Sequence, residues 1–269
     1  MDLTKDNITE LIKKIAIPAS VGTFFQTMYN LVDSKFAGLI SPEALTAIVK
    51  SFPIYLIIIA ASVGISAGTT ALISNTLGQK DTEKASVLFA QSIIVALLIT
   101  FVVTFIGIAS IKDILIILKS NNQIISYATD YMNVIFSGSI VIFLLVTINA
   151  SLVSRGDTKS YRNVLIFSFF LNILLNPLFI YGFYLIPAMG ISGIALATIV
   201  SELIGLIYLI YKINKTEIRE YLSPECFKPK IALISDILKQ AIPSGLSMGM
   251  VGFGVFILIY LVSSYGDFS

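Results

Sequence analysis

An aspartate inside an apolar segment is the first feature of this sequence that could do chemistry. Asp33 lies in the segment 15–38, which is otherwise mainly apolar and long enough to cross a lipid bilayer as one helix. On that helix Gln26, Asn30 and Asp33 have the spacing i, i+4 and i+7 and form one polar stripe. Ionisable groups at membrane depth usually face a bundle interior or a watery cavity. The stripe therefore predicts a transport site.

A second group of polar residues occurs in the apolar segment 164–186. Ser168, Asn172 and Asn176 follow one another at four-residue spacing, and Pro177 comes next. Proline lacks a backbone donor and leaves a carbonyl one turn earlier without its helical partner. The pattern predicts a kinked helix with amide side chains near the kink, where an ion or water could bind. The alternative is that both asparagines only join neighbouring helices.

A second carboxylate, Glu202, lies near the middle of the segment 191–211 and shares a helical face with Thr198. Like Asp33, it is an acidic residue well inside an apolar run. It could hold a cation, or it could be protonated and bonded to a neighbouring helix. Asp33 itself could instead pair with Lys35 or reach the outer surface, although residues two apart on a helix point in different directions.

The composition is that of a membrane protein. Of the 269 residues, 56% are hydrophobic and 13% are charged, and the chain has one cysteine and no histidine. This inventory excludes histidine-ligated metal sites, Ser–His–Asp triads and disulfides within the chain. A net charge of +2 gives no sign of nucleic-acid binding. No enzyme is expected, because no segment gathers a nucleophile, a base and metal ligands.

The apolar runs predict an all-α, polytopic helix bundle in the membrane, with a six-helix lobe and a seventh helix. Short connections favour antiparallel neighbours, and the four-residue spacing of Gly64 and Gly68 favours close helix packing. The polar residues 1–14 are interpreted as a retained cytoplasmic leader. Seven spans are expected near 15–38, 52–77, 88–109, 131–153, 164–186, 191–211 and 241–262. The predicted divisions are a lobe at 1–211, a cytoplasmic linker at 212–240 and the first helix of an incomplete second lobe at 241–269.

The distribution of basic residues predicts the orientation. Fourteen lysines and arginines lie on the side of the N-terminus and three on the opposite side, with Lys35 inside the first span. By the positive-inside rule the N-terminus is cytoplasmic, and Asp33 lies in the outer half of its helix. The expected location is the cytoplasmic membrane of a bacterium.

A short internal repeat relates the first span to the seventh. The sequence Lys14-Ile-Ala-Ile-Pro18 returns as Lys239-Gln-Ala-Ile-Pro243, each time at the cytoplasmic entry to a span. Chance is one explanation, since a lysine before an apolar run is common. The other is that the seventh span starts a second copy of the first six in the same orientation, as in transporters built from parallel halves.

Several motifs, taken together and in order, resemble those of multidrug and toxic compound extrusion (MATE) transporters, and they cover nearly the whole chain. They are Pro18, Gln26-Thr-Met-Tyr-Asn-Leu-Val-Asp33 and Gly38, Ser74-x-x-x-Gly78 with Ala85, Asn149 with Arg155-Gly-Asp-Thr158, Asn172-x-x-x-Asn176-Pro177, and Gly190-x-x-Gly193-x-Ala195-x-Ala197-Thr198. The resemblance implies twelve helices in two lobes that alternate in access. It also implies export of amphipathic, often cationic compounds, coupled to inward flow of H⁺ or Na⁺.

The resemblance also implies roles for particular residues. Asp33 matches the carboxylate linked to cation coupling, whereas Asn176 stands where many members have an aspartate and Glu202 where glutamine is more usual. One hypothesis is that the acidic partner has moved to Glu202. The cation-coupling residues are expected to be Asp33, Asn30, Asn172, Asn176, Thr198 and Glu202, and the substrate-binding residues Gln26 and Tyr29. No cofactor is expected beyond the coupling ion, and Na⁺ at Asp33 is the one metal ion considered.

The expected partners are the lipid bilayer, small amphipathic or cationic substrates and a second lobe, and nucleic acid is not among them. Family members have about twelve spans, so a chain with seven is expected to be part of a working exporter. Two alternatives remain open. One is a lipid-linked saccharide flippase of the same superfamily, which should carry more cationic residues at depth than Lys35. The other is a truncated membrane fragment that does not transport.

Overall fold

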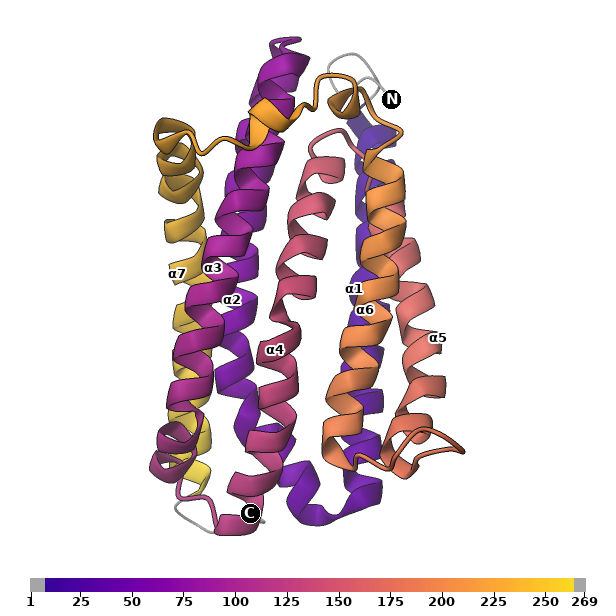
Figure 1. The fold of residues 1–269 in the computed structure, drawn as a ribbon, viewed down its shortest axis with the longest axis vertical. Coiled ribbons are helices and arrows are strands. Elements are labelled where there is room, and N and C mark those ends of the chain that lie inside the picture. The colour runs from indigo at the N-terminus through magenta and orange to yellow at the C-terminus, as the bar shows by residue number, and fades with distance from the viewer. Residues whose placement is uncertain (1–7, 264–269) are drawn as a thin grey trace.

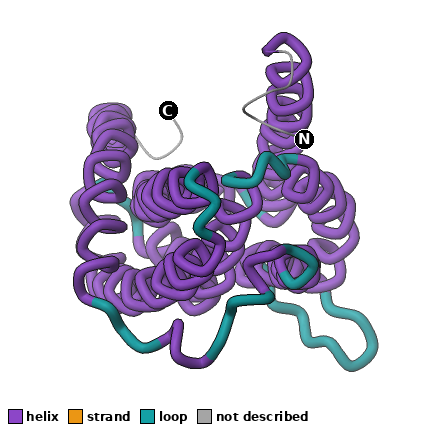
Figure 2. The backbone as a smooth tube through the Cα atoms, turned by 90° about the horizontal axis from the view of Figure 1, so that it is seen from above, coloured by secondary structure: helices purple, strands orange, loops and turns teal. Residues whose placement is uncertain are grey.

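The computed structural model describes residues 8–263, and over this range the fold is all-α, as predicted. The long helices lie side by side in one bundle, which Figure 1 shows from the side and Figure 2 end-on. An isolated bridge between Phe183 and Ile186 closes one loop. The α-helices are α1 (Ile8–Ile40), α2 (Pro42–Gly78), α3 (Thr82–Ile117), α4 (Asn122–Val153), α5 (Lys159–Tyr181), α6 (Ile191–Ile213) and α7 (Ile231–Val262).

The seven helices match the seven expected spans in order. Six of them, α2 to α7, are long and apolar enough to cross a membrane. α1 is not apolar enough to count as a membrane-crossing helix by the same criteria, because polar residues interrupt its apolar run. It nevertheless lies lengthwise beside α5 and α6 in the bundle (Figure 1). Residues 1–7 of the expected leader and 264–269 of the expected second lobe lie outside the described residues.

Side-chain caps explain where three of the helices begin. A cap oxygen accepts a hydrogen bond from a backbone N–H in the first turn, which otherwise has no partner inside the helix. The capped helices are α2, α3 and α4. Each follows the helix before it after a short turn and runs antiparallel to it. The bonds are Ala44 N to Ser41 Oγ (3.1 Å), Lys84 N to Asp81 Oδ1 (3.0 Å) and Ile124 N to Asn121 Oδ1 (2.9 Å).

α4 is the central helix of the bundle. It packs against α2 and α3 on one side and against α6 on the other, and it lies between these groups in Figure 1. Its buried side chains include Phe136 and Phe143, which are among the largest fully buried residues of the core. Polar side chains from α1, α2 and α6 line a cavity between these helices, among them Asn30, Ser51 and Thr198.

α7 packs on α2 through glycine, as the spacing of Gly64 and Gly68 predicts. A Cβ atom at Gly64 would lie 2.6 Å from the carbonyl oxygen of Ala241, and one at Gly68 would lie 2.6 Å from that of Ile237. Both positions are therefore restricted to glycine at this helix separation. Small residues let transmembrane backbones approach closely, which is the packing interpretation of this motif.

The connection between α6 and α7 is shorter than the expected linker 212–240, because α7 begins at Ile231. Residues 231–240 carry charges, such as the exposed Lys239–Asp236 ion pair (3.2 Å). Because of these charges, the segment is not part of a long apolar run. Its helical spacing nevertheless buries Ile237. The division of the chain into a lobe, a linker and a second lobe stays a prediction.

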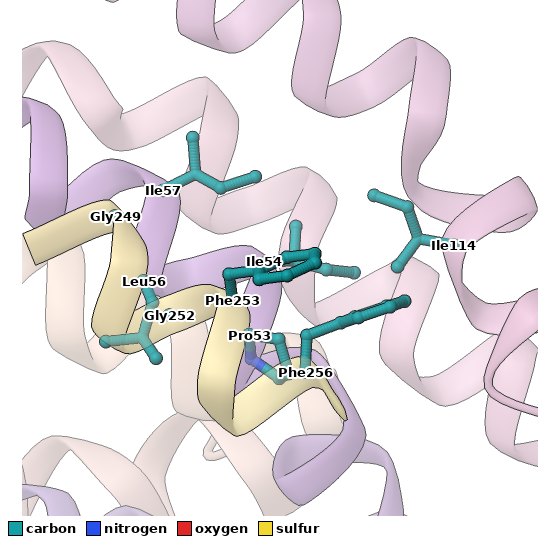
Figure 3. A pocket seen from close by; sticks show the side chains of 9 residues that line it. All are labelled: Pro53, Ile54, Leu56, Ile57, Ile114, Gly249, Gly252, Phe253 and Phe256. Carbon is teal, nitrogen blue, oxygen red and sulfur yellow. The ribbon is translucent and has the colours of Figure 1, made fainter. Parts of the chain in front are cut away.

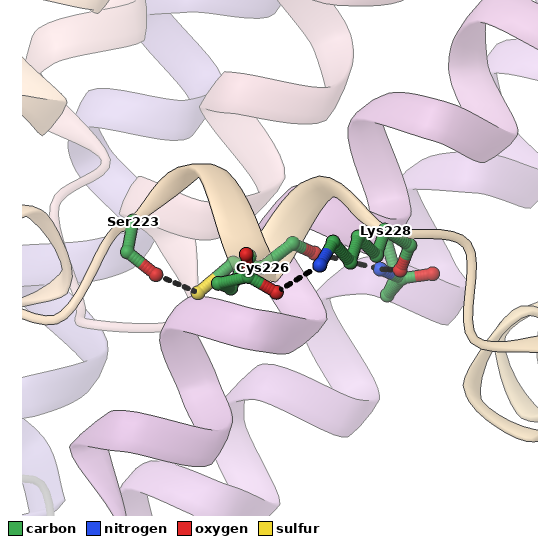
Figure 4. Close-up of polar contacts among 5 residues, drawn as sticks. Ser223, Cys226 and Lys228 are labelled. Atoms are coloured by element: carbon green, nitrogen blue, oxygen red, sulfur yellow. Dashed lines mark hydrogen bonds and ion pairs between the residues drawn. The ribbon is translucent and has the colours of Figure 1, made fainter.

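Residues 214–230 form a strap that is bound to α3. The strap contains two 3₁₀ turns, Glu217–Arg219 and Pro224–Phe227. The buried amide of Gln91 donates to the carbonyls of Cys226 (2.7 Å) and Lys228 (2.9 Å) and accepts from Lys230 N (2.8 Å). In Figure 4, Ser223 lies beside the sulfur of Cys226 in the second turn, and Lys228 follows it. The strap is therefore held against α3 by these hydrogen bonds.

Candidate functional site

Asp33 lies in a cluster of hydrogen-bond donors from two other helices. Its side chain is 6% exposed. Oδ1 accepts hydrogen bonds from Nδ2 of Asn172 and from Nδ2 of Asn176, both at 3.0 Å. Oδ2 accepts one from Oγ1 of Thr198 at 2.9 Å. The four residues Asp33, Asn172, Asn176 and Thr198 are called the Asp33 cluster below, and they bring together α1, α5 and α6.

Local packing explains how α5 and α6 present these donors. Asn172 and Asn176 are one turn apart on α5, and Nδ2 of Asn176 also donates to Oδ1 of Asn172 at 2.9 Å. α6 approaches α5 closely because Gly193 faces it: a Cβ there would lie 2.6 Å from the backbone carbon of Phe179. α5 continues through Pro177 to Tyr181, and the expected kink stays a prediction.

The hydrogen-bond partners of Asp33 are neutral, so the net charge of the cluster is that of the Asp33 carboxyl group alone. Transferring an ionised carboxylate out of water is costly unless hydrogen bonds replace its hydration. Three donors replace part of that hydration here, but none of them carries a positive charge. Lys35, the alternative partner, is exposed on α1. An ionised Asp33 thus keeps an uncompensated negative charge inside the bundle, which would attract a cation.

A cavity of about 130 Å³ opens beside the Asp33 cluster. Gln26, Tyr29 and Asn30 from α1 line it together with Asp33. Asn30 is therefore at the wall of the cavity and outside the hydrogen-bonded cluster. Among the described residues the buried hydroxyl of Tyr29 has no hydrogen-bond partner. We call this the Asp33 cavity.

Glu202 borders the same cavity, one helical turn beyond Thr198 on α6. The structure shows no hydrogen bond between Glu202 and the Asp33 cluster within the described chain, and the buried Oε2 of Glu202 has no partner there. The two carboxylates are therefore neighbours around one space and not a hydrogen-bonded pair. The hypothesis that Glu202 takes over a coupling role stays a prediction.

Three tyrosines that the sequence reasoning missed line the space next to Glu202. Tyr55 and Tyr131 border the Asp33 cavity, and Tyr161 borders the next one. A tyrosine within an apolar run combines an apolar ring with a hydroxyl that needs a hydrogen-bond partner. This property was the feature of the sequence that could have indicated a cavity-lining role. The sequence alone does not tell such residues from tyrosines that face lipid or the core.

A larger cavity, of about 600 Å³, adjoins the Asp33 cavity, and we call it the main cavity. The two share the lining residues Gln26, Asn30, Tyr55 and Glu202. Asn149 of the sequence motif also lines the main cavity, and its buried Oδ1 has no partner in the described chain. The predicted substrate residue Gln26 thus borders both spaces, and Tyr29 borders the smaller one.

A separate pocket of about 240 Å³ lies among α2, α3 and α7 (Figure 3). Its wall is apolar, and Figure 3 shows Phe253 and Phe256 of α7 opposite Ile54 of α2. It has no polar side chain in its lining. This pocket therefore lacks the groups that would hold an ion.

Comparison with known proteins agrees with the motifs. The MatE family model matches residues 18–178. The chain is 29% identical to the probable multidrug resistance protein NorM of Thermotoga maritima, over 98% of this chain and 58% of that protein. It is also 29% identical to the probable multidrug resistance protein YpnP of Bacillus subtilis, over 99% of this chain and 59% of that protein. The chain thus spans less than two thirds of the length of these relatives.

A solved structure shares the fold. It is described as the inward-facing conformation of a multidrug resistance MATE family transporter of the MOP superfamily, and it matches with a TM-score of 0.81 and 26% identity. The match covers 94% of this chain and 58% of that one. The match of the family model to more than half of the chain shows that the protein belongs to the MatE family, the multidrug and toxic compound extrusion transporters.

Proposed function

We propose that this chain is the cation-binding part of an exporter that moves amphipathic, cationic compounds out of the cell in exchange for an inward-moving cation. The observation that carries the proposal is Asp33, a carboxylate buried in the helix bundle whose hydrogen-bond partners are all neutral. The names of the relatives, which are multidrug resistance proteins, support the direction of transport. The proposed location is the cytoplasmic membrane, with the N-terminus inside.

The Asp33 cluster can take a proton with little rearrangement. Oγ1 of Thr198 carries one hydrogen and lies near two acceptors, Oδ2 of Asp33 at 2.9 Å and the carbonyl oxygen of Ile194 at 3.2 Å. When Asp33 is ionised, Thr198 donates to it. When Oδ2 carries a proton, Asp33 donates to Thr198, and the hydroxyl turns to Ile194. Both charge states of Asp33 therefore keep a hydrogen bond at this position.

Sodium needs a larger change at the same site. Na⁺ requires oxygen ligands, whereas both asparagines present their N–H groups to Asp33. Rotating the amide of Asn176 would turn its Oδ1, which has no partner in the described chain, toward the carboxylate. For this reason we propose H⁺ as the coupling ion and treat Na⁺ as the competing outcome.

The cavity linings favour a cationic substrate over an anionic one. Asp33 and Glu202 are the charged residues that line the two cavities, and no lysine or arginine of the described chain joins them. A phosphate-bearing substrate, such as a lipid-linked saccharide, would meet two carboxylates without a cationic partner. Because the chain spans 58% of NorM, the rest of the exporter, a second lobe, is a proposed partner.

Transport of ethidium, an organic cation, tests the proposal. The protein is expressed from its complete native gene, and ethidium uptake is followed in inverted membrane vesicles under an imposed pH or Na⁺ gradient. We expect the pH gradient to drive uptake, Asp33→Asn to abolish it, and Asp130→Asn, which changes an exposed aspartate of α4, to leave it intact.

Three results would oppose this function. Uptake driven by Na⁺ alone would replace the proton by sodium, and unchanged uptake by Asp33→Asn would remove Asp33 from coupling. A wild-type protein that is correctly inserted but moves no ethidium would favour a non-transporting fragment. Size-exclusion chromatography of each variant separates loss of transport from loss of folding.

A further inference from the structure

The two carboxylates differ in how much of their acceptor capacity is already used. Both oxygens of Asp33 already accept hydrogen bonds, three in total. Glu202 is different, because its buried Oε2 has no partner in the described chain. An ionised oxygen without donors in a low-dielectric site is a strong acceptor for a positive group. Glu202 therefore has an unused acceptor, which its side chain can present to a bound molecule by turning Oε2 from its buried position into the cavity.

Glu202 lies where three spaces meet. It lines the Asp33 cavity, the main cavity and a small cavity of about 20 Å³ between α1, α4, α5 and α6. It is the one charged residue among the described residues that line the main cavity. No basic side chain in that lining competes for it. When it is ionised, Glu202 supplies the negative charge in the lining of the main cavity.

The main cavity has the size and wall of a site for a drug-sized molecule. Its volume of about 600 Å³ lies within the roughly 300–1,000 Å³ that is usual for such sites. Tyr55 and Tyr161 place aromatic rings in the lining with Glu202, and aromatic faces attract organic cations. Amides line it too, and most of the remaining wall is aliphatic: Ile58, Ile59, Val63, Ile142, Leu145 and Val146.

We propose that Glu202 is the counter-ion of the transported substrate, an organic cation with an apolar aromatic body that binds in the main cavity, while Asp33 serves the coupling ion. This inference rests on the proposed exporter function and assigns its two carboxylates to different ligands. The charged centre of the substrate lies against the carboxylate of Glu202. Its body contacts the tyrosine rings and the aliphatic wall.

Paired ligands separate charge from shape in the test. Tetraphenylphosphonium is a permanent cation, and triphenylphosphine oxide is a neutral molecule with three of the same phenyl groups. Binding of each is measured by calorimetry to the protein from its complete native gene, in lipid nanodiscs. We expect Glu202→Gln to weaken tetraphenylphosphonium binding about tenfold or more, which is the size of one charge-assisted interaction, and to leave the neutral ligand within about twofold.

One control defines the specificity. Glu83→Gln removes an exposed carboxylate of α3 and should leave both affinities unchanged. Retained cation binding by Glu202→Gln, or equal loss of both ligands, would overturn the proposal.

The outcomes also separate this inference from the proposed function. If wild-type protein binds tetraphenylphosphonium through Glu202 but moves no ethidium in vesicles, the counter-ion assignment stands and the exporter function falls. If ethidium moves and Glu202→Gln binds the cation normally, the exporter stands and the counter-ion assignment falls.

Discussion

The contact between α2 and α7 should be sensitive to a single methyl group at Gly68. In Gly68→Ala the new Cβ would lie 2.6 Å from the carbonyl oxygen of Ile237, whereas ordinary contacts begin at 3.4 Å. The helices must therefore separate locally by a sizeable part of an ångström, and a gap of that size forfeits a quarter to a half of each dispersion contact across it. Overpacking of this kind costs about 1–3 kcal/mol.

A glycine on the open face of α7 supplies the matched control. A Cβ at Gly254 would meet no atom within 4 Å, so Gly254→Ala should show only the gain in helix propensity, up to about 1 kcal/mol. Equilibrium unfolding in mixed micelles with increasing SDS measures both variants. We expect Gly68→Ala to be less stable than Gly254→Ala by about 2 kcal/mol. Equal stability of the two would refute the close packing of α2 on α7.

Two further substitutions test hydrogen bonds that join distant parts of the chain. Gln91→Leu removes three hydrogen bonds to the strap 214–230 and should lower the unfolding free energy by about 2 kcal/mol or more. Trypsin should then cleave the strap faster. The control Gln79→Leu, at an exposed helix end, should not change the cleavage rate. Thr198→Val removes the hydroxyl donor of Asp33 and should lower the unfolding free energy by about 1.5–3 kcal/mol, as measured by SDS unfolding. Thr198→Ser keeps the donor and should stay near wild type, and equal loss in both Thr198 variants would contradict the role of the hydroxyl.

Much of the fold could be predicted because a membrane restricts the choice of structure. Backbone groups in lipid must be satisfied within the segment, so each long apolar run has to become a helix. The beginning of α7 was harder to predict, because residues 231–240 are helical through the burial of Ile237 and carry exposed charges. The length of an apolar run does not predict how far a helix continues outside the bilayer.

The sequence indicated which residues share a helical face, but not how those faces meet. Helical spacing placed Asn172 and Asn176 on one face, and both now contact Asp33. The same reasoning put Glu202 and Asn30 into the group, but the structure places them around the adjoining cavity. Periodicity reports which face of its own helix a residue occupies. It does not report the rotation of that helix against its neighbours.

The sequence by itself determined that the chain forms apolar helices and that one of them carries an aspartate, because composition and helical period are local properties. Tertiary structure alone decided which donors reach that carboxylate. Thr198 is 165 residues from Asp33 in the chain, and their contact depends on how closely α6 can approach its neighbours. Tertiary structure also left Oε2 of Glu202 without a donor from the described residues. Whether a buried oxygen is satisfied depends on every helix around it, and this distinguishes the two acidic residues.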